Sequence, residues 1–358
     1  VSYAQLGLVL GAMYVVSGIC QVLAGFAVDR FGARRVLLFG MTMMSSGIIL
    51  VGLSTNYPLL FVGACCAGLG NSVFHPADFS VLNTRVDRTR LGHAYSTHSI
   101  GGNLGWAAAP IWSMSLASLF GWNHALILGG VAGLIATALV ATQHEILTAP
   151  RHARAVGVPA KPPSNWALFT QAPILMCFGY FVLFSLCIVG TQTFSVPALQ
   201  SLYGVPLALA TTSLTAFLLG GAGGILAGGF IANRTDAHAS VAACGMFCAA
   251  LFGFIIASGG VPAMLVVLVL ALMGFCLGMT GPSRDMLVRA NTPAGATGRV
   301  YGFVYSGLDV GAIIGPVAFG WYIDHNVPRM VFVSVALCML LTIATIASLP
   351  KRRSYALR

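Results

Sequence analysis

Long apolar stretches, each bounded by a short polar turn, recur along the whole chain. About 20 apolar residues in a helix cross a bilayer core, and the alternating ten-residue pattern of an outer-membrane barrel is absent from the sequence. The pattern therefore predicts an all-α membrane protein with eleven spans. These cover residues 2–28, 36–54, 58–84, 91–119, 123–142, 166–196, 206–232, 239–258, 262–288, 298–322 and 327–349.

Composition supports this prediction. Of the 358 residues, 58% are hydrophobic and 7% are charged, whereas a soluble domain carries about 25% charged residues. Most of the surface must therefore face something other than water.

The formal net charge of +10 has a topological explanation. When the lysines and arginines are sorted by side of the membrane, all fall at one set of alternate helix ends except Arg329. Such a bias marks the cytoplasmic side. It predicts a multi-pass protein of a bacterial-type inner membrane with a cytoplasmic C-terminus. The basic residues would face anionic lipid headgroups, and no nucleic-acid partner is expected.

A proline-rich and basic loop at 143–165 divides the chain into an N-terminal bundle at 1–142 and a C-terminal bundle with a short basic tail at 166–358. Eleven spans with the C-terminus inside place residue 1 outside the membrane. An even number of spans with both ends inside is the ordinary design, so we expect the sequence to lack one N-terminal span.

The two halves repeat one another. The segment Gly92-x-x-Tyr95-Ser96 matches Gly302-x-x-Tyr305-Ser306, 210 residues later. Because the charge bias gives both halves the same orientation, the repeat is parallel, with its pseudo-two-fold axis along the membrane normal. Repeats of this kind place a substrate site between the halves, near the bilayer midplane.

The segment GFAVDRFGARR at 25–35 resembles the signature loop of the major facilitator superfamily. The resemblance implies two six-helix bundles, in which residues 2–28 are the second span, the first half holds spans two to six and the second half spans seven to twelve. It also implies secondary transport by alternating access, with a charge network at the cytoplasmic rim that closes the outward-facing state. The gate residues would be Gly25, Asp29, Arg30, Gly32, Arg34 and Arg35.

Within that superfamily, the run GLGNSVFHP at 68–76, followed by GGNLG at 101–105, resembles the fosmidomycin-resistance group of efflux proteins. The chain departs from that group because Ala77 follows the proline and the carboxylate arrives at Asp78. An antiporter-type glycine-proline motif runs from Gly311 to Pro316, while Trp106 takes the proline position in the first half.

Ionisable side chains inside spans are functional candidates because they are costly to bury. His75 and Asp78 are three residues apart and share a helix face, and His98 reaches a similar depth. These groups can bind and release protons near neutral pH. The alternative is a structural hydrogen bond from a histidine to a carbonyl freed by Pro76 or a glycine. A metal site is not expected, since no fourth ligand is evident.

In the second half, Asp309 lies in mid-span with no sequence neighbour to neutralise it. Arg284 and Asp285 are adjacent, and adjacent side chains diverge on a helix, so we expect each to pair with another span. Arg284 would either receive an anionic substrate or snorkel to the interface. Further polar side chains can line the path, although for each one taken singly a structural role is favoured: Asn71, Asn103, Trp106, Tyr180 and Gln192.

Taken together, the residues and the resemblance predict a monomeric, proton-coupled transporter of a small organic solute that needs no cofactor beyond a proton gradient. Export and uptake by symport are both open, and export is favoured. An alternative from another class is a membrane-embedded hydrolase using His75, Asp78 and His98. That alternative lacks an HExxH or GxSxG motif.

Overall fold

A computed structural model describes residues 3–147 and 165–349 and confirms the all-α fold for them. Most of the predicted linker at 143–165 and the basic tail lie outside the described residues. The helices are α1 (Tyr3–Phe31), α2 (Ala33–Gly52), α3 (Tyr57–Asn71), α4 (Phe74–Arg85), the 3₁₀ turn η1 (Arg88–Arg90), α5 (Leu91–Phe120), α6 (Trp122–Thr142), α7 (His144–Leu147), α8 (Asn165–Phe169), α9 (Ala172–Tyr203), α10 (Leu207–Arg234), α11 (His238–Ala257), α12 (Ala263–Ala290), α13 (Thr297–Asp324) and α14 (Arg329–Ala347).

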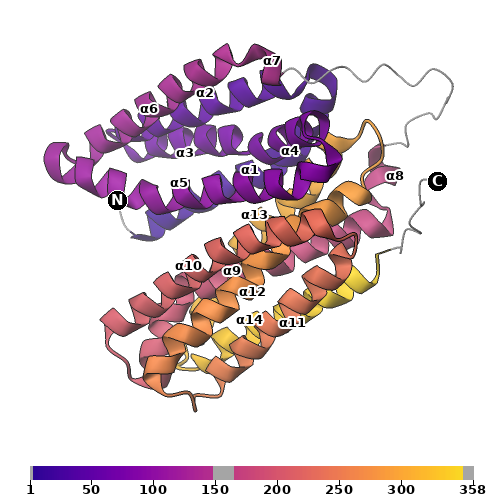
Figure 1. Cartoon of the computed structure of the whole chain (residues 1–358). Coiled ribbons are helices and arrows are strands. Elements are labelled where there is room, and N and C mark those ends of the chain that lie inside the picture. Colours follow the sequence, from indigo (N-terminus) through magenta and orange to yellow (C-terminus); the bar gives the residue numbers. More distant parts are fainter. Residues whose placement is uncertain (1–2, 148–164, 350–358) are drawn as a thin grey trace, which may run out of the picture.

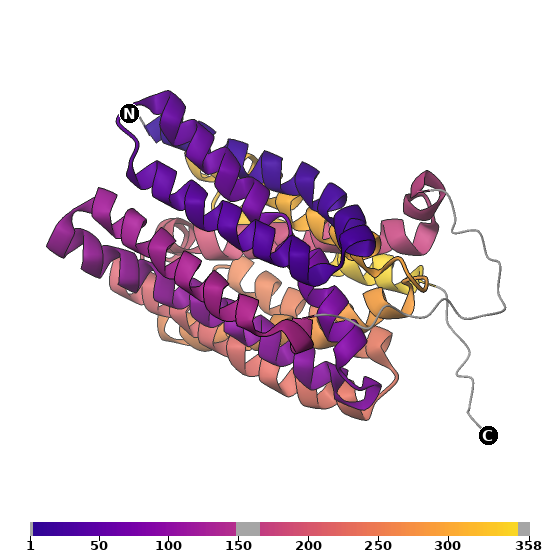
Figure 2. The ribbon, with the colours of Figure 1, turned by 90° about the horizontal axis from the view of Figure 1, so that it is seen from above.

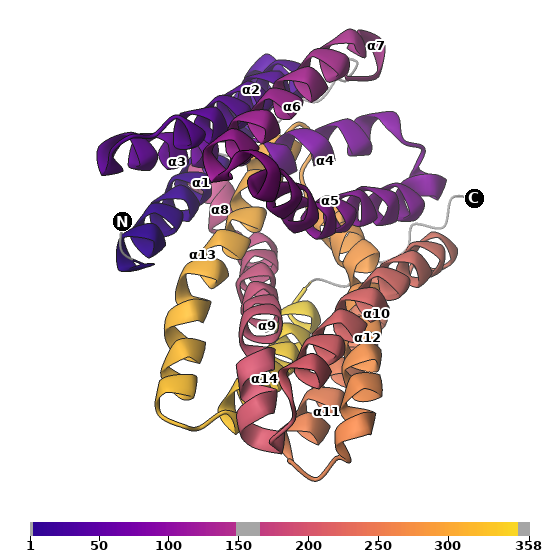
Figure 3. The ribbon, with the colours of Figure 1, turned by 90° about the vertical axis from the view of Figure 1, so that its left-hand side faces the viewer.

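The long helices form two bundles, with α1–α6 in one and α9–α14 in the other (Figure 1). Seen from above, the helices of both bundles run in roughly the same direction (Figure 2). The bundles meet mainly through two helix pairs, α1 against α13 and α5 against α10, which lie side by side in the end-on view (Figure 3). The arrangement agrees with the expected two-bundle repeat.

Ten segments of the described chain are long and apolar enough to cross a membrane. The eleventh predicted span is α5, a helix of 30 residues that is about 45 Å long at 1.5 Å per residue. Its length exceeds the roughly 30 Å of a bilayer core. It falls outside the ten because glycine, asparagine, serine and histidine interrupt its apolar sequence.

The predicted span at 58–84 is broken in two. α3 ends at Asn71 and α4 begins at Phe74. Pro76 lacks an N–H, and its ring clashes with the carbonyl four residues earlier, which belongs to Ser72. Pro282 interrupts α12 in sequence but leaves that helix continuous. The repeat therefore has a break in one half only.

Glycines let neighbouring helices approach until their backbones touch, as in membrane proteins generally. α10 and α12 show this along their length. A Cβ built at Gly224 would lie 2.1 Å from the Phe275 carbonyl oxygen, and one at Gly274 would lie 2.0 Å from that of Phe217. No larger side chain fits there unless the helices move apart.

The two bundles touch most closely at the end of the molecule that carries Arg30, Arg85, Arg234, Arg289 and Arg299, which we call the basic end. There, a Cβ at Gly25 would lie 2.4 Å from the Gly298 carbonyl oxygen, and one at Gly229 would lie 2.6 Å from Cβ of Ser96. Towards the opposite end, residues 101–112 of α5 are all exposed. The interface is therefore closed at the basic end.

We expect Gly224→Ala to destabilise the C-terminal bundle by about 1–3 kcal/mol, the usual effect of overpacking. The matched control is Gly223→Ala, because a Cβ at Gly223 would meet only the Phe275 ring at 3.8 Å. Thermal unfolding of both variants in detergent measures the difference. Equal melting temperatures would show that α10 and α12 do not pack this closely.

Candidate functional site

Asp29 links the two bundles at the basic end. Its carboxylate accepts hydrogen bonds from the backbone N–H of Gly298 at 2.8 Å and of Arg299 at 3.2 Å, and Arg299 Nε lies 2.9 Å from Oδ2. Gly298 and Arg299 lie in the first turn of α13, where free N–H groups and the helix dipole favour an anion. Asp29 therefore holds the end of α1 on the start of α13.

The arginines that follow Asp29 in sequence go elsewhere. Arg34 donates to the Ala141 carbonyl oxygen of α6 at 2.9 Å, within the same bundle. The Arg30 guanidinium lies 5.2 Å from the centre of the Phe31 ring, and Arg35 is exposed. Gly32 has a φ of +88° and separates α1 from α2. The ion-pair partner of Asp29 is thus Arg299. The sequence did not predict this pair, although it places Arg299 at the start of the span 298–322.

A second contact closes the other side of the interface. Asn233, at the end of α10, accepts a hydrogen bond from the Gly92 N–H at 2.8 Å. Ser96 Oγ donates to the Ile225 carbonyl oxygen, also at 2.8 Å. Asn233 occupies the position in the second half that Asp29 occupies in the first. The Asn233–Gly92 contact is therefore the neutral counterpart of the charged contact between Asp29 and the start of α13.

Aromatic rings fill the interface deeper along the helices. Phe79 of α4 stacks on Tyr301 of α13 with ring centroids 4.6 Å apart, and His75 lies 4.4 Å from Tyr305. Phe79, Tyr301 and Tyr305 are buried. These rings therefore pack α4 against α13.

Asp78 and His98 come together as the sequence suggested. His98 Nε2 lies 3.8 Å from Asp78 Oδ2, and the side chains are 33% and 21% exposed, respectively. His75 lies one turn earlier on α4, and its Nδ1 is buried without a hydrogen-bond partner in the described structure. The group therefore holds one carboxylate and two imidazoles beside the aromatic contact.

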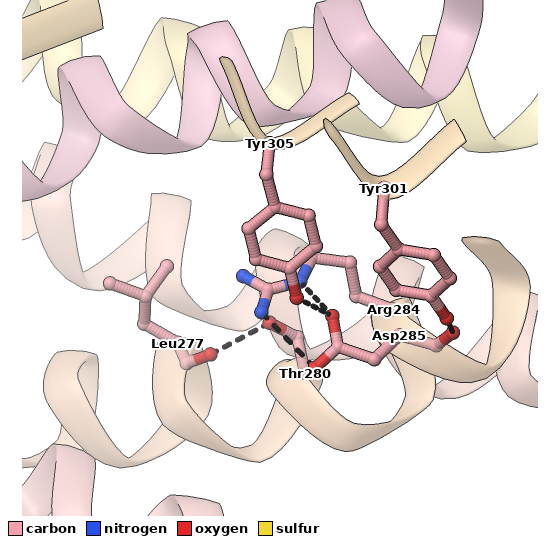
Figure 4. Close-up of polar contacts among 6 residues, drawn as sticks. All are labelled: Leu277, Thr280, Arg284, Asp285, Tyr301 and Tyr305. Carbon is pink, nitrogen blue, oxygen red and sulfur yellow. Dashed lines mark hydrogen bonds and ion pairs between the residues drawn. The ribbon is translucent and has the colours of Figure 1, made fainter. Parts of the chain in front are cut away.

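Arg284 and Asp285 were expected to pair with other spans, but they form an ion pair with each other. Arg284 Nε lies 2.9 Å from Asp285 Oδ1, and Nη2 lies 3.3 Å from Oδ2. The long arginine side chain folds back along α12 and reaches the neighbouring carboxylate, as Figure 4 shows. Asp285 is 0% exposed and Arg284 is 12% exposed. Because little or no water reaches either charge, each one is stabilised mainly by the other.

Two tyrosines of α13 complete this pair. Tyr305 donates its hydroxyl to Asp285 Oδ1 at 2.8 Å, and the Tyr301 hydroxyl donates to the Asp285 backbone carbonyl at 3.2 Å (Figure 4). The Arg284 guanidinium also lies 4.5 Å from the centre of the Phe181 ring, a favourable cation–π position. Because Tyr301 and Tyr305 also contact α4, the buried ion pair is joined to the interface between the bundles.

Asp309 lies about one turn beyond Tyr305 on α13 and is 7% exposed. It packs against α1, since a Cβ at Gly18 would lie 3.0 Å from the Asp309 Cβ. On the neighbouring residue of α1, Ser17 Oγ accepts a hydrogen bond from Asn71 Nδ2 at 2.9 Å. The structure thus brings Asp309, Ser17 and Asn71 together where α1, α3 and α13 meet.

The other residues that were predicted to line the solute path differ in burial. Tyr180 is 4% exposed, lies beside Arg284, and its hydroxyl has no hydrogen-bond partner in the described structure. Asn103, Trp106 and Gln192 are exposed, and Asn103 donates only to the Ser99 carbonyl of its own helix. Within the described ranges, no group of three or more metal-ligating side chains lies close enough to hold a metal ion.

The chain is similar in sequence to a family of known membrane proteins. The family model described as Major Facilitator Superfamily matches residues 1–316 and, in a second match, residues 194–357. The fosmidomycin resistance protein of Escherichia coli (strain K12) is 24% identical over 240 residues, which cover 65% of this chain and 57% of that protein. The chain thus spans less than two thirds of that relative. The hexuronate transporter of Bacillus subtilis is 23% identical over 356 residues, covering 91% and 80%.

Solved structures share the fold. The E. coli fucose:proton symporter FucP has a TM-score of 0.75 at 18% identity, covering 98% of this chain and 92% of that one. The human organic anion transporter MFSD10 has a TM-score of 0.75 at 16% identity, covering 95% and 83%. With the family match across the whole chain, these likenesses confirm the resemblance seen in the sequence. The chain belongs to the Major Facilitator Superfamily, a family of secondary transporters and not of enzymes.

Proposed function

We propose that this protein moves a small organic solute across a bacterial inner membrane in exchange for protons, with the basic end in the cytoplasm. The observation that carries the proposal is the pattern of contacts between the bundles. They meet at the basic end through Asp29 on α13 and Asn233 on α5. This is the pattern expected of an outward-facing state, which rocking of the bundles would convert to an inward-facing one.

Two acids inside the spans support proton coupling. Asp78 pairs with His98 in the N-terminal bundle, and Asp309 lies on α13 against α1. A carboxyl group away from water takes up a proton more readily than one in water. Such a group can load a proton when it faces one side and release it when the other side wets it. The two acids thus lie where a conformational change would alter their hydration.

Export is favoured over uptake because the fosmidomycin resistance protein is among the relatives. Uptake by symport is the second candidate, supported by the hexuronate transporter and the fucose:proton symporter among the similar proteins. The hydrolase alternative is set aside, since the family is one of transporters. A panel of solutes tested on proteoliposomes with an imposed pH gradient distinguishes export from uptake by the direction of proton movement.

The orientation is tested by labelling single cysteines in intact cells. Thr55→Cys, in the turn between α2 and α3, is expected to react with an impermeant maleimide added outside. Asp236→Cys, between α10 and α11, is expected to react only after the membrane is opened. Both residues are exposed, so access depends only on the side of the membrane. The reverse pattern would place the basic end outside and contradict the charge argument.

The Asp29 contact is tested by Asp29→Asn. The amide can still accept one hydrogen bond from Gly298, but the ion pair with Arg299 is lost. Hydrogen bonds to charged groups contribute about 1.5–3 kcal/mol, so we expect the basic end to open about ten- to hundredfold more often. The labelling rate of a cysteine at Ser96, which is 4% exposed, reports the opening.

The matched control for Asp29→Asn is Asp87→Asn. Asp87 is an exposed acid at the same end that bonds only to Thr89 in its own turn. Its substitution is expected to leave labelling at Ser96 unchanged. If Asp29→Asn behaves like this control, Asp29 does not hold the basic end closed.

The coupling acids are tested by Asp78→Asn and Asp309→Asn. We expect both variants to lose solute movement driven by a pH gradient, and at least one to retain solute exchange without a gradient, because exchange needs no net proton transfer. Flux of the first solute found by the panel measures both. Asp324→Asn, at the exposed end of α13, is the control. Normal gradient-driven movement in both variants would remove these acids from the mechanism.

A further inference from the structure

Two arginines of the 25–35 loop take no part in closing the interface. Neither Arg35 nor Arg30 makes an ion pair or a hydrogen bond with another described residue, and the Arg30 guanidinium lies 5.2 Å from the centre of the Phe31 ring. Asp29, the acid beside them, is already neutralised by Arg299 of the other bundle. Among the described residues, these two cationic side chains therefore have no acidic partner.

A groove begins beside these arginines. It lies between α1, α2 and the end of α3, has a volume of about 400 Å³, and we call it the lateral groove. Its walls include Cys20, Ala27, Phe31, Phe39 and Val73, and Arg35 is the one charged residue that lines it. Phe31 is 54% exposed and Phe39 is 50% exposed. The groove is therefore apolar and open, with a cation at one end.

The lateral groove faces away from the path between the bundles. On α1, the residues that meet α13 include Gly18, Gln21, Gly25 and Asp29. Those that line the groove are Cys20, Leu23, Ala24, Ala27 and Phe31. At 3.6 residues per turn, the two sets fall on opposite sides of the helix. The groove therefore opens toward the surrounding lipid and not toward a solute crossing between the bundles.

The dimensions fit one chain of a lipid. From Cys20 to Phe31 the groove follows α1 for about 16 Å at 1.5 Å per residue, which is about half of the roughly 30 Å hydrocarbon core. It starts at the basic end, where headgroups lie, and reaches the middle of the membrane. Basic pockets between helices are known to bind the headgroups of anionic lipids.

We propose that the lateral groove binds an anionic phospholipid. One acyl chain lies between α1, α2 and α3, and the phosphate pairs with Arg35, with Arg30 beside it across Phe31. The lipid would touch α1 close to Asp29 and would also touch Ser72 and Val73, the break between α3 and α4. It would therefore contact the break between α3 and α4, directly before His75 and Asp78.

The experiment uses the full chain in a mild detergent, incubated with equal amounts of phosphatidylglycerol and phosphatidylcholine that carry identical acyl chains. Native mass spectrometry measures the ratio of the two lipids retained. An arginine near an anionic lipid contributes about fivefold in affinity. Arg35→Gln is therefore expected to lower the retained ratio of phosphatidylglycerol to phosphatidylcholine about fivefold.

Two further variants make the test specific. Arg88→Gln removes an exposed arginine of the same end, outside the groove, and is expected to retain the wild-type ratio. Ala27→Phe fills the groove and is expected to lower retention of both lipids while leaving the melting temperature close to that of the wild type, since Ala27 lines the groove and is only partly buried. Unchanged lipid preference in Arg35→Gln overturns the proposal. So does unchanged retention in Ala27→Phe, or a retained mass equal to a second copy of the chain in place of lipid.

Discussion

Glycines that let helices of the two bundles approach closely hold the bundles together at the basic end. Gly25 meets the backbone of Gly298, and Gly229 meets the side chain of Ser96, so closely that neither Gly25 nor Gly229 could carry a Cβ. Only at such separations can the Asp29 carboxylate reach the free N–H groups of α13, and the Asn233 amide the N–H of Gly92. The hydrogen bonds depend on the glycines, and the closure of the interface depends on both. One side of this closure carries a charge and the other does not, so the two contacts differ electrostatically despite the repeat.

Charged side chains inside the spans are stabilised by partners on the same helix and on neighbouring helices. Asp285 is fully buried, yet it has Arg284 beside it and the Tyr305 hydroxyl above it. Breaking a buried pair leaves one charge uncompensated, which is far more costly than the pair is stabilising. Asp78 and Asp309 differ from Asp285. Asp78 has only a histidine at 3.8 Å, and Asp309 packs against Gly18 of α1. Neither acid has an arginine or lysine partner within the described residues, whereas Asp285 has Arg284.

Residues 25–35 contribute to two separate surfaces. Asp29 faces the other bundle, while Phe31 at the end of α1 and Arg35 at the start of α2 line the lateral groove on the lipid side. An acid and several arginines within a short segment suggest a single charge network when read in sequence. The three-dimensional arrangement separates them, because positions along α1 point in different directions and the turn at Gly32 starts a new helix before Arg34 and Arg35. A lipid held by Arg35 and the ion pair made by Asp29 would thus act on the same end of α1 from opposite sides.

The sequence by itself determined the membrane class, the spans, the parallel repeat, the family resemblance and the acids within the spans that are worth testing. Each of these follows from local hydropathy, charge placement or a short motif. Only the tertiary structure decided that Asp29 pairs with Arg299, 270 residues away, that Arg284 turns back onto Asp285, and that Asn103, Trp106 and Gln192 are exposed. It also showed the break at Ser72 and Val73, for which Pro76 was the available signal. Partners across an interface depend on how helices dock and rotate against one another, and a hydropathy pattern specifies that a helix is buried in lipid without fixing which residue of another helix it meets.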